Sequence, residues 1–328
     1  MPSVHANGLD IAYAVHGAGP PLVMLHGATS GREDFAAQVP LFSKAFLVHL
    51  PDARGHGATR WDVANGFRYD WLVDDLAAFV DALGIGTFHL LGFSMGGVTA
   101  LQFAARWPER LRTLVVAGIT TQREPRVSVA RRLMDPARIE RDDAAWAAAL
   151  TRRHDPVQGS GAWQRLLPAI VADIASQPLL GPAELRRIDV PTLVAAGDRD
   201  VFVPVDHAWG LKRQLPDARL FIAPDCPHEI MVKRPALFNE ACAGFYRSTE
   251  AIARGRSSGV WRALDSATDA TTDGGADAQP PADAQPPADA QPPADAQPPA
   301  DAQPPADAQP PADAQPPADA QPPKGGHP

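Results

Sequence analysis

Residues 88–98 read FHLLGFSMGGV, an apolar run followed by a serine between two glycines. The run Phe88–Leu91 has the length and composition of a buried strand, and apolar residues at helical spacing begin at Val98. A G-x-S-x-G pattern at a strand-to-helix turn is typical of a nucleophilic serine, because the sharp turn exposes the hydroxyl and leaves no room for flanking Cβ atoms. Ser94 is therefore the candidate nucleophile, and the following helix directs free N–H groups toward it.

The sequence around this motif alternates apolar runs of strand length with amphipathic helical patterns. Apolar residues recur at three- and four-residue steps over 69–83 and again over 98–105. This alternation predicts an α/β fold with a mostly parallel sheet flanked by helices. The expected strands cover residues 21–25, 46–50, 88–91, 114–117, 192–196 and 219–222.

One interval, Thr120 to Ile188, breaks this alternation. It contains no convincing strand pattern, but its large apolar residues, Trp146 and Trp163 among them, recur at helical spacing. We expect a helical insertion that forms a lid over the strand ends, where parallel sheets place their sites. An interpretation of these aromatic residues as local core stays open and partly coexists with the lid.

The end of the chain has a different composition. The hexapeptide Ala-Asp-Ala-Gln-Pro-Pro repeats eight times over residues 276–323, and residues 251–275 are rich in Ser, Thr, Gly and Asp. A segment without large apolar side chains cannot form a core, so we expect a disordered spacer there. The predicted organisation is a core in two parts, 1–119 and 189–250, interrupted by the lid at 120–188 and followed by a linker at 251–275 and a disordered tail at 276–328.

Charge and composition exclude several classes of function. The repeat aspartates and Lys324 account for all but about one unit of the net charge of −8, so residues 1–275 are almost neutral and show no basic face for nucleic acid or membranes. No signal-peptide pattern or long apolar run appears, and we expect a cytoplasmic protein. Cys226 and Cys242 are too few for a disulfide framework or a cysteine zinc site. We expect no metal and no cofactor.

A serine hydroxyl is a weak nucleophile near neutral pH, so it needs a base and an acidic group that orients this base. Of the ten histidines, only His228 follows the last expected strand in a loop that precedes a helix. The strand at 192–196 leads into two acidic residues, Asp198 and Asp200, and by composition either can serve. Both choices give the chain order Ser, Asp, His.

Residues 20–246 resemble the α/β-hydrolase superfamily in several motifs that occur in the family's order. At GDRDVFVP, residues 197–204, the resemblance implies that Asp200 is the catalytic acid and that Asp198 stabilises the loop. Asp200, assigned in this way, completes a predicted triad with Ser94 and His228.

The same resemblance assigns further backbone and scaffold roles. Residues 26–28, HGA, resemble the family's oxyanion segment, which implies the backbone N–H groups of Ala28 and Met95 as the two donors to the oxyanion. His26 itself is then expected to be structural. The segment DARGHG, residues 52–57, is similar to a family loop that we interpret as scaffold.

The sequence predicts the fold more closely than the function, for which three alternatives remain. A serine at this turn excludes members with an aspartate nucleophile and favours acyl chemistry, so we expect hydrolysis of a small ester-like substrate, a carboxylic ester, thioester or lactone, through an acyl-serine. A C–C bond hydrolase of ring-cleavage products is the alternative, and a ligand receptor or scaffold on the same fold is a third. The expected lid also carries candidates for binding a substrate carboxylate or for a solvated helix face: Arg131, Arg132, Arg152 and Arg153.

Overall fold

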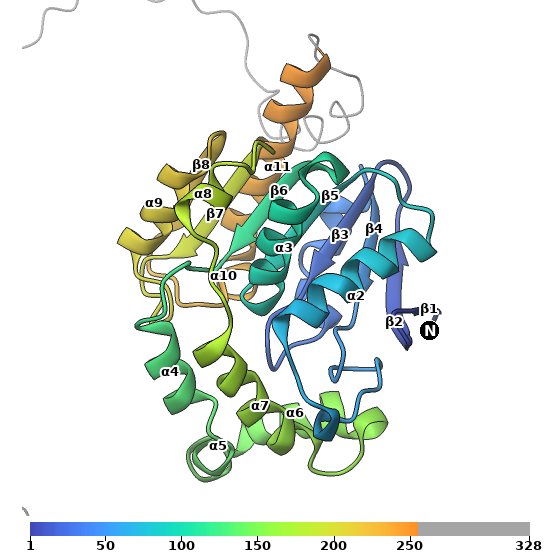
Figure 1. Cartoon of the computed structure of the whole chain (residues 1–328), viewed down its shortest axis with the longest axis vertical. Coiled ribbons are helices and arrows are strands. Elements are labelled where there is room, and N and C mark those ends of the chain that lie inside the picture. Colours follow the sequence, from blue (N-terminus) through green and yellow to red (C-terminus); the bar gives the residue numbers. More distant parts are fainter. Residues whose placement is uncertain (255–328) are drawn as a thin grey trace, which may run out of the picture. The chain divides into compact units, whose positions relative to one another are not determined.

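The computed structural model describes residues 1–254, and within them eight strands form one sheet in the order β1-β2-β4-β3-β5-β6-β7-β8 (Figure 1). The pairs β1–β2 and β2–β4 are antiparallel, and the other neighbouring strands are parallel. This confirms the predicted α/β fold with a mostly parallel sheet. The strands are β1 (Ser3–Ala6), β2 (Leu9–His16), β3 (Pro21–Leu25), β4 (Leu47–Pro51), β5 (Phe88–Phe93), β6 (Leu111–Ala117), β7 (Thr192–Gly197) and β8 (Ala218–Ala223).

All six strands expected from the sequence are present, with small shifts at their ends. β6 begins at Leu111, three residues before the predicted start at Leu114. The sequence pattern misses these residues because exposed Arg112 interrupts the apolar run by which a buried strand is recognised. The antiparallel strands β1 and β2 lie outside the predicted set. Their exposed residues break up the apolar run by which a fully buried strand is detected.

Consecutive residues of the central strands face opposite sides of the sheet and enter two separate buried clusters. Leu90 and Leu114 belong to one cluster, whereas Leu91 and Val115 belong to the other. Because helices cover both faces, these strands are apolar on both sides. The first cluster includes residues of α2 (Tyr69–Ala82), α3 (Met95–Arg106) and α9 (Val205–Gln214), and the second includes residues of α1 (Val39–Phe42), α10 (Ile230–Lys233) and α11 (Pro235–Arg254).

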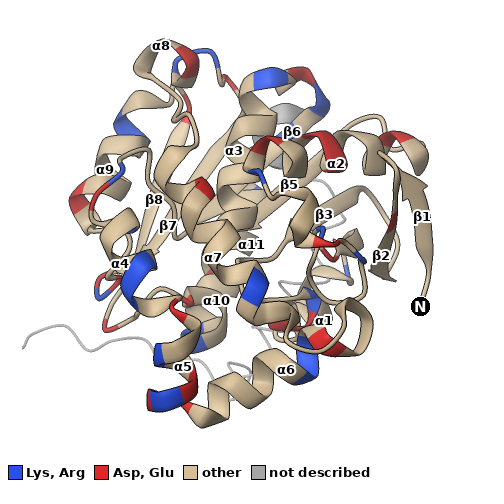
Figure 2. Cartoon of the chain, turned by 60° about the horizontal axis from the view of Figure 1, so that its bottom comes forward, with Lys and Arg blue, Asp and Glu red and all other residues tan. Residues whose placement is uncertain are grey.

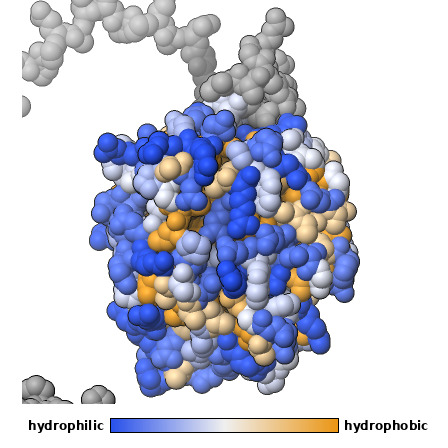
Figure 3. All heavy atoms as spheres, in the orientation of Figure 1, coloured by the Kyte–Doolittle hydropathy of each residue, from blue (hydrophilic) through white to orange (hydrophobic). Residues whose placement is uncertain are grey.

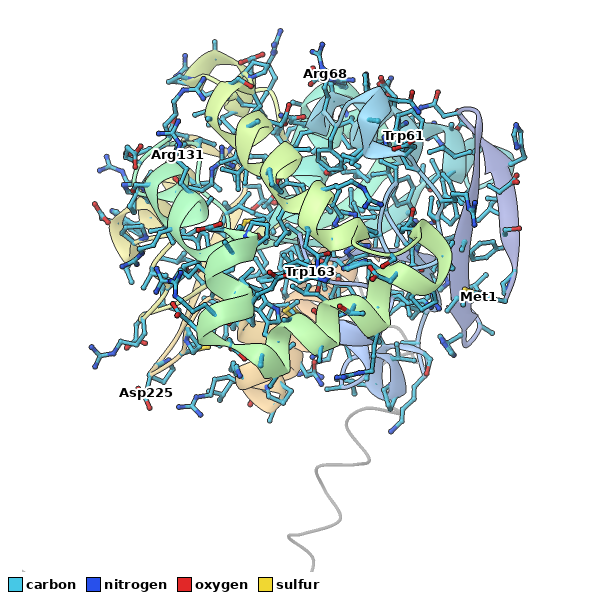
Figure 4. All side chains as sticks on the ribbon, turned by 90° about the horizontal axis from the view of Figure 1, so that it is seen from below. Met1, Trp61, Arg68, Arg131, Trp163 and Asp225 are labelled. Carbon is cyan, nitrogen blue, oxygen red and sulfur yellow. The ribbon has the colours of Figure 1, made fainter. Side chains whose placement is uncertain are left out.

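Five helices occupy the segment between β6 and β7 where the helical insertion is expected. They are α4 (Arg126–Leu133), α5 (Pro136–Asp142), α6 (Ala144–Gln158), α7 (Ala162–Ser176) and α8 (Pro182–Leu185). Helices α4 to α7 lie together beyond one end of the sheet (Figure 1). Seen from below, they cross over the sheet domain, with Trp163 near the middle of this layer and Arg131 toward its margin (Figure 4). Trp163 is 1% exposed and shares a buried cluster with α2 and α3, so this layer is packed onto the sheet domain.

Short 3-10 turns complete the described elements: Arg32–Phe35, Val63–Asn65 and Pro108–Arg110. α11 continues to Arg254 and so runs past residue 251, where the linker is expected to begin. The reason is local, because Ala251, Ile252 and Ala253 are all compatible with a helix and residues 245–254 contain no Gly or Pro. The rest of the predicted linker and the predicted tail lie outside the described residues.

The surface of the described part carries charges of both signs. In the view of Figure 2, the segments coloured for basic and for acidic residues are interspersed rather than gathered in one region. In Figure 3, hydrophobic residues form small patches that hydrophilic residues separate. Among residues 1–254, no helix has both the length and the apolar character that crossing a bilayer requires.

Candidate active site

Ser94 lies at the sharp turn between β5 and α3, with φ +51° and ψ −113°. A residue other than glycine costs about 1–3 kcal/mol in such a conformation, so its surroundings must hold it there. The N–H of Ser94 donates to the carbonyl of Ala117 at 2.8 Å, and the N–H of Gly96 donates to the carbonyl of His26 at 3.1 Å. A Cβ at residue 96 would lie 2.4 Å from the carbonyl oxygen of Leu25, so this position requires glycine.

His228, in the loop after β8, lies between the other two predicted triad residues. Its Nε2 is 3.0 Å from Ser94 Oγ, and its Nδ1 is 2.7 Å from Asp200 Oδ2. The carboxylate of Asp200 is fully buried, and its Oδ1 accepts from the N–H groups of Phe202 and Val203 at 2.8 and 3.0 Å. Three donors therefore fix the carboxylate that orients the imidazole.

The structure distinguishes the two acidic residues that composition leaves equivalent. Asp198 is exposed, and its Oδ1 accepts from the N–H of Cys226 at 3.0 Å. Hydrogen bonds from backbone N–H groups, that of Cys226 first, hold the pKa of Asp198 below its usual range. It ties two loops together, whereas Asp200 contacts His228.

The two predicted oxyanion donors line the same cavity as Ser94. Met95 is the first residue of α3, so its N–H has no acceptor within the helix. The N–H of Ala28 donates no hydrogen bond to another described residue. The adjacent residue, Thr29, has φ +64°, and its carbonyl accepts from Arg153 Nη1 at 2.7 Å, so α6 helps to hold this loop.

Ser94 and His228 open onto a cavity of about 660 Å³. This volume is within the range of small-molecule sites. The helices of the insertion contribute much of its apolar wall: Leu133, Met134, Ala145, Trp146, Ala149 and Ile174. Of the two tryptophans singled out in the sequence, Trp146 lines the cavity, whereas Trp163 is core, with its indole N–H donating to Thr151 Oγ1 at 3.0 Å. Trp163 therefore fits the interpretation as core, whereas Trp146 lies where a bound molecule could contact it.

Comparison with known proteins agrees with this architecture. The family model of the alpha/beta hydrolase fold matches residues 20–153. A meta-cleavage product hydrolase from Pseudomonas fluorescens IP01 superposes with a TM-score of 0.63 at 22% identity, over 76% of this chain and 98% of its own. The chain belongs to the α/β-hydrolase superfamily.

Two other similar proteins differ in the substrates that their names state. The 2-hydroxy-6-oxononadienedioate/2-hydroxy-6-oxononatrienedioate hydrolase of Klebsiella pneumoniae subsp. pneumoniae is 29% identical over 267 residues, which are 74% of this chain and 90% of the relative. An N-acyl homoserine lactone degrading enzyme of known structure is 27% identical with a TM-score of 0.62, over 74% of this chain and 100% of its own. These similarities support hydrolase activity for this α/β-hydrolase without fixing the bond that it cleaves.

The four arginines predicted as carboxylate candidates have different environments. Arg153 lines the cavity, but its guanidinium donates to the Thr29 carbonyl and pairs with Glu33 and, at 3.1 Å, with Asp34. Its donors are therefore engaged by the Thr29 carbonyl and by two carboxylates. The other three are exposed: Arg131, Arg132 and Arg152.

Arg126 is a cavity-lining cation that the sequence does not single out. It is the first residue of α4 and is only 7% exposed. The one sequence signal is its place at a helix N-terminus, where the helix dipole disfavours a cation. That signal is weak, because the start of α4 is itself not fixed by the sequence.

The segments interpreted as scaffold have contacts that suit this role. His26 Nε2 accepts from the N–H of Ala53 at 3.0 Å, so the imidazole joins residues 26–28 to residues 52–57. Arg54 in that segment donates from Nε and Nη2 to the two oxygens of Asp75 at 2.6 and 2.5 Å. Within residues 1–254, no three His, Cys, Asp or Glu side chains are grouped as metal ligands.

His154 of α6 provides a test of how the insertion is held. It is fully buried, accepts from the N–H of Gly57 at 3.2 Å, and lies 5.5 Å from the ring of His56. Burial lowers the pKa of His154 to about 4. Between pH 6.5 and 4 the unfolded chain therefore binds a proton that the folded chain does not, and stability falls as pH decreases.

We expect His154→Gln to reduce the pH dependence of stability. From about pH 7.5 to about pH 5, His154 should remove about 2 kcal/mol of unfolding free energy from the wild type. Urea unfolding of both proteins at the two pH values measures this difference. An equally steep loss in the variant would show that His154 is not the group that titrates.

Proposed function

We propose that this α/β-hydrolase is a serine hydrolase that cleaves a carboxylic ester, thioester or lactone. The observation that carries the proposal is the hydrogen-bonded series Ser94, His228 and Asp200 at the wall of a 660 Å³ cavity. A hydroxyl in contact with a base that a buried carboxylate orients is the arrangement that nucleophilic catalysis requires.

In the proposed mechanism, Ser94 Oγ attacks the substrate carbonyl while His228 Nε2 takes the hydroxyl proton. Asp200 keeps the proton of His228 on Nδ1 and stabilises the imidazolium that forms. The N–H groups of Ala28 and Met95 donate to the oxyanion of the tetrahedral intermediate. His228 then protonates the leaving alcohol, and water that His228 activates releases the acid from acyl-Ser94.

We also propose that residues 120–188 act as a lid that shapes the substrate pocket. Their apolar side chains, such as Met134, Trp146 and Ile174, favour a moderately hydrophobic acyl or alcohol group. Each buried methylene contributes about 0.8 kcal/mol, a factor of three to four in binding. We therefore expect a preference for acyl chains of medium length.

A second candidate is hydrolysis of a C–C bond in a ring-cleavage product. It is favoured by the names of the Klebsiella relative and the Pseudomonas structure, whereas the name of the lactone-degrading enzyme favours the first candidate. The same serine, base and oxyanion donors suit attack on a ketone carbonyl. The substrate therefore has to be decided by experiment.

The test is turnover of p-nitrophenyl esters from acetate to octanoate, of N-acyl homoserine lactones, and of a 2-hydroxy-6-oxo dienoic acid. We expect kcat/KM for the hexanoate ester to exceed that for acetate roughly tenfold or more, because the wall is apolar. Turnover confined to the dienoic acid would establish the C–C candidate. A folded protein that turns over none of the three would point to a receptor or scaffold.

A further inference from the structure

The guanidinium of Arg126 is buried, and two of its three nitrogen atoms have no hydrogen-bond partner among residues 1–254. Its Nε and Nη2 are inaccessible to solvent and make no hydrogen bond to any residue described in the structure. Burying a cation without compensation costs several kcal/mol, so a site of this kind is rarely retained for stability alone. Burial also lowers the pKa of Arg126, although a guanidinium remains charged near neutral pH.

The neighbours of Arg126 compensate this charge only in part, because Asp173 attracts it without a hydrogen bond to Nε or Nη2. Tyr69, Arg123 and Asp173 act on it electrostatically. Asp173 uses its Oδ2 to accept from the N–H of Tyr69 at 3.1 Å, and it forms no hydrogen bond with Arg126. Arg123 adds a like charge, and the N-terminus of α4 adds a further positive potential. The surroundings of Arg126 therefore favour an anion.

Arg126 lines the cavity that contains Ser94. Two other cations line this cavity, but Arg153 is committed to the Thr29 carbonyl and two carboxylates, and Lys233 is exposed. Of these three cations, Arg126 is the one that is buried and that has two donors, Nε and Nη2, without an acceptor among the described residues. The acidic residues of the lining are engaged or exposed: Asp34 with Arg153, Asp143 at the N-cap of α6, and exposed Glu229.

The two free donors, Nε and Nη2, lie on one edge of the guanidinium, which is the edge that matches both oxygens of a carboxylate. Arg54 of the same chain uses this edge for its bidentate pair with Asp75. In the structure this edge is closed to solvent. We propose that the side chain of Arg126 turns this edge into the cavity and binds a carboxylate of the substrate, so that the enzyme selects acyl compounds with an anionic group at the end remote from the scissile carbonyl. This inference rests on the proposed serine hydrolase function of the same cavity.

Matched pairs of esters test the inference. The p-nitrophenyl monoesters of succinic, glutaric and adipic acid are compared with p-nitrophenyl butyrate, valerate and hexanoate, which have the same number of acyl carbons but no carboxylate. For the pair that the wild type discriminates best, we expect Arg126→Met to lower the ratio of kcat/KM, anionic over neutral, roughly 100-fold. Arg126→Lys keeps the charge but loses the planar fork, and should lose about tenfold.

Arg131→Met is the matched control, because Arg131 lies on the same helix but is exposed. Its ratio should equal that of the wild type. The melting temperature of Arg126→Met should be equal to or above that of the wild type, because the variant removes an unpaired buried charge. An Arg126→Met ratio equal to that of the wild type at all three lengths would overturn the inference.

A binding measurement separates this inference from the proposed function. Should the wild type hydrolyse none of these esters, the ester assignment fails, but adipate, glutarate and hexanoate still probe Arg126 by thermal shift. We then expect the carboxylates to raise the melting temperature of the wild type and of Arg131→Met, and not of Arg126→Met. No shift in the wild type, or an equal shift in Arg126→Met, would overturn the carboxylate site.

Discussion

Ser94→Ala is expected to lower kcat for the best ester or lactone substrate roughly 10⁴- to 10⁶-fold while the fold is retained. The variant removes Oγ, the atom that lies 3.0 Å from His228 Nε2 and that forms the acyl bond in the proposed mechanism. The oxyanion donors and the cavity remain, so a small residual rate above that of water is expected. The strained backbone of the turn is equally compatible with Ala and Ser, because the hydrogen bond from this N–H to Ala117 is unaffected.

The measurement is single-substrate kinetics on protein whose melting temperature matches that of the wild type. Ser160→Ala is the control, since Ser160 is exposed and does not line the cavity. Activity of Ser94→Ala within about tenfold of the wild type would contradict the assigned nucleophile. Loss of activity in both variants would instead indicate a defect of the preparations.

Local patterns in the sequence predict the sheet and two members of the proposed triad, Ser94 and His228, because each is a property of a short segment. Ser94 is marked by flanking glycines that the turn requires, and His228 by its place after the last strand. The choice of Asp200 over Asp198 rested on family resemblance, because two carboxylates separated by one residue differ only in which way the loop turns them. Backbone donors at Phe202 and Val203 decide this, and they belong to the folded loop.

Arg126 could not be found in the same way. Its distinguishing property is that, among the residues that the structure describes, Nε and Nη2 find no hydrogen-bond acceptor, although Tyr69 and Asp173 lie near in the fold. The arginines that the sequence suggests instead, Arg153 among them, differ from it only in tertiary contacts. A pattern along the chain reports periodicity and local turns, but it does not report which buried charges remain uncompensated.

Asp200→Asn is expected to lower kcat roughly 10³- to 10⁴-fold, whereas Asp198→Asn should change it by less than about tenfold. These two variants make the same chemical change at positions two residues apart. Their comparison measures the contact with His228 separately from any general effect of removing a negative charge in this loop. Kinetics of both variants with one substrate, together with their melting temperatures, provides the test, and equal losses would contradict the assignment of Asp200.

The expected loss in Asp200→Asn follows from the hydrogen bonds of the carboxylate. Oδ1 accepts from the N–H groups of Phe202 and Val203, so an asparagine at this position keeps its carbonyl oxygen toward these donors and turns its NH₂ toward His228. His228 Nδ1 must then accept a hydrogen bond, which moves the ring proton to Nε2. A protonated Nε2 cannot take the proton of Ser94. At Asp198, by contrast, the amide oxygen of asparagine still accepts from the N–H of Cys226. The proton of His228 therefore stays on Nδ1, and Nε2 can still accept the proton of Ser94.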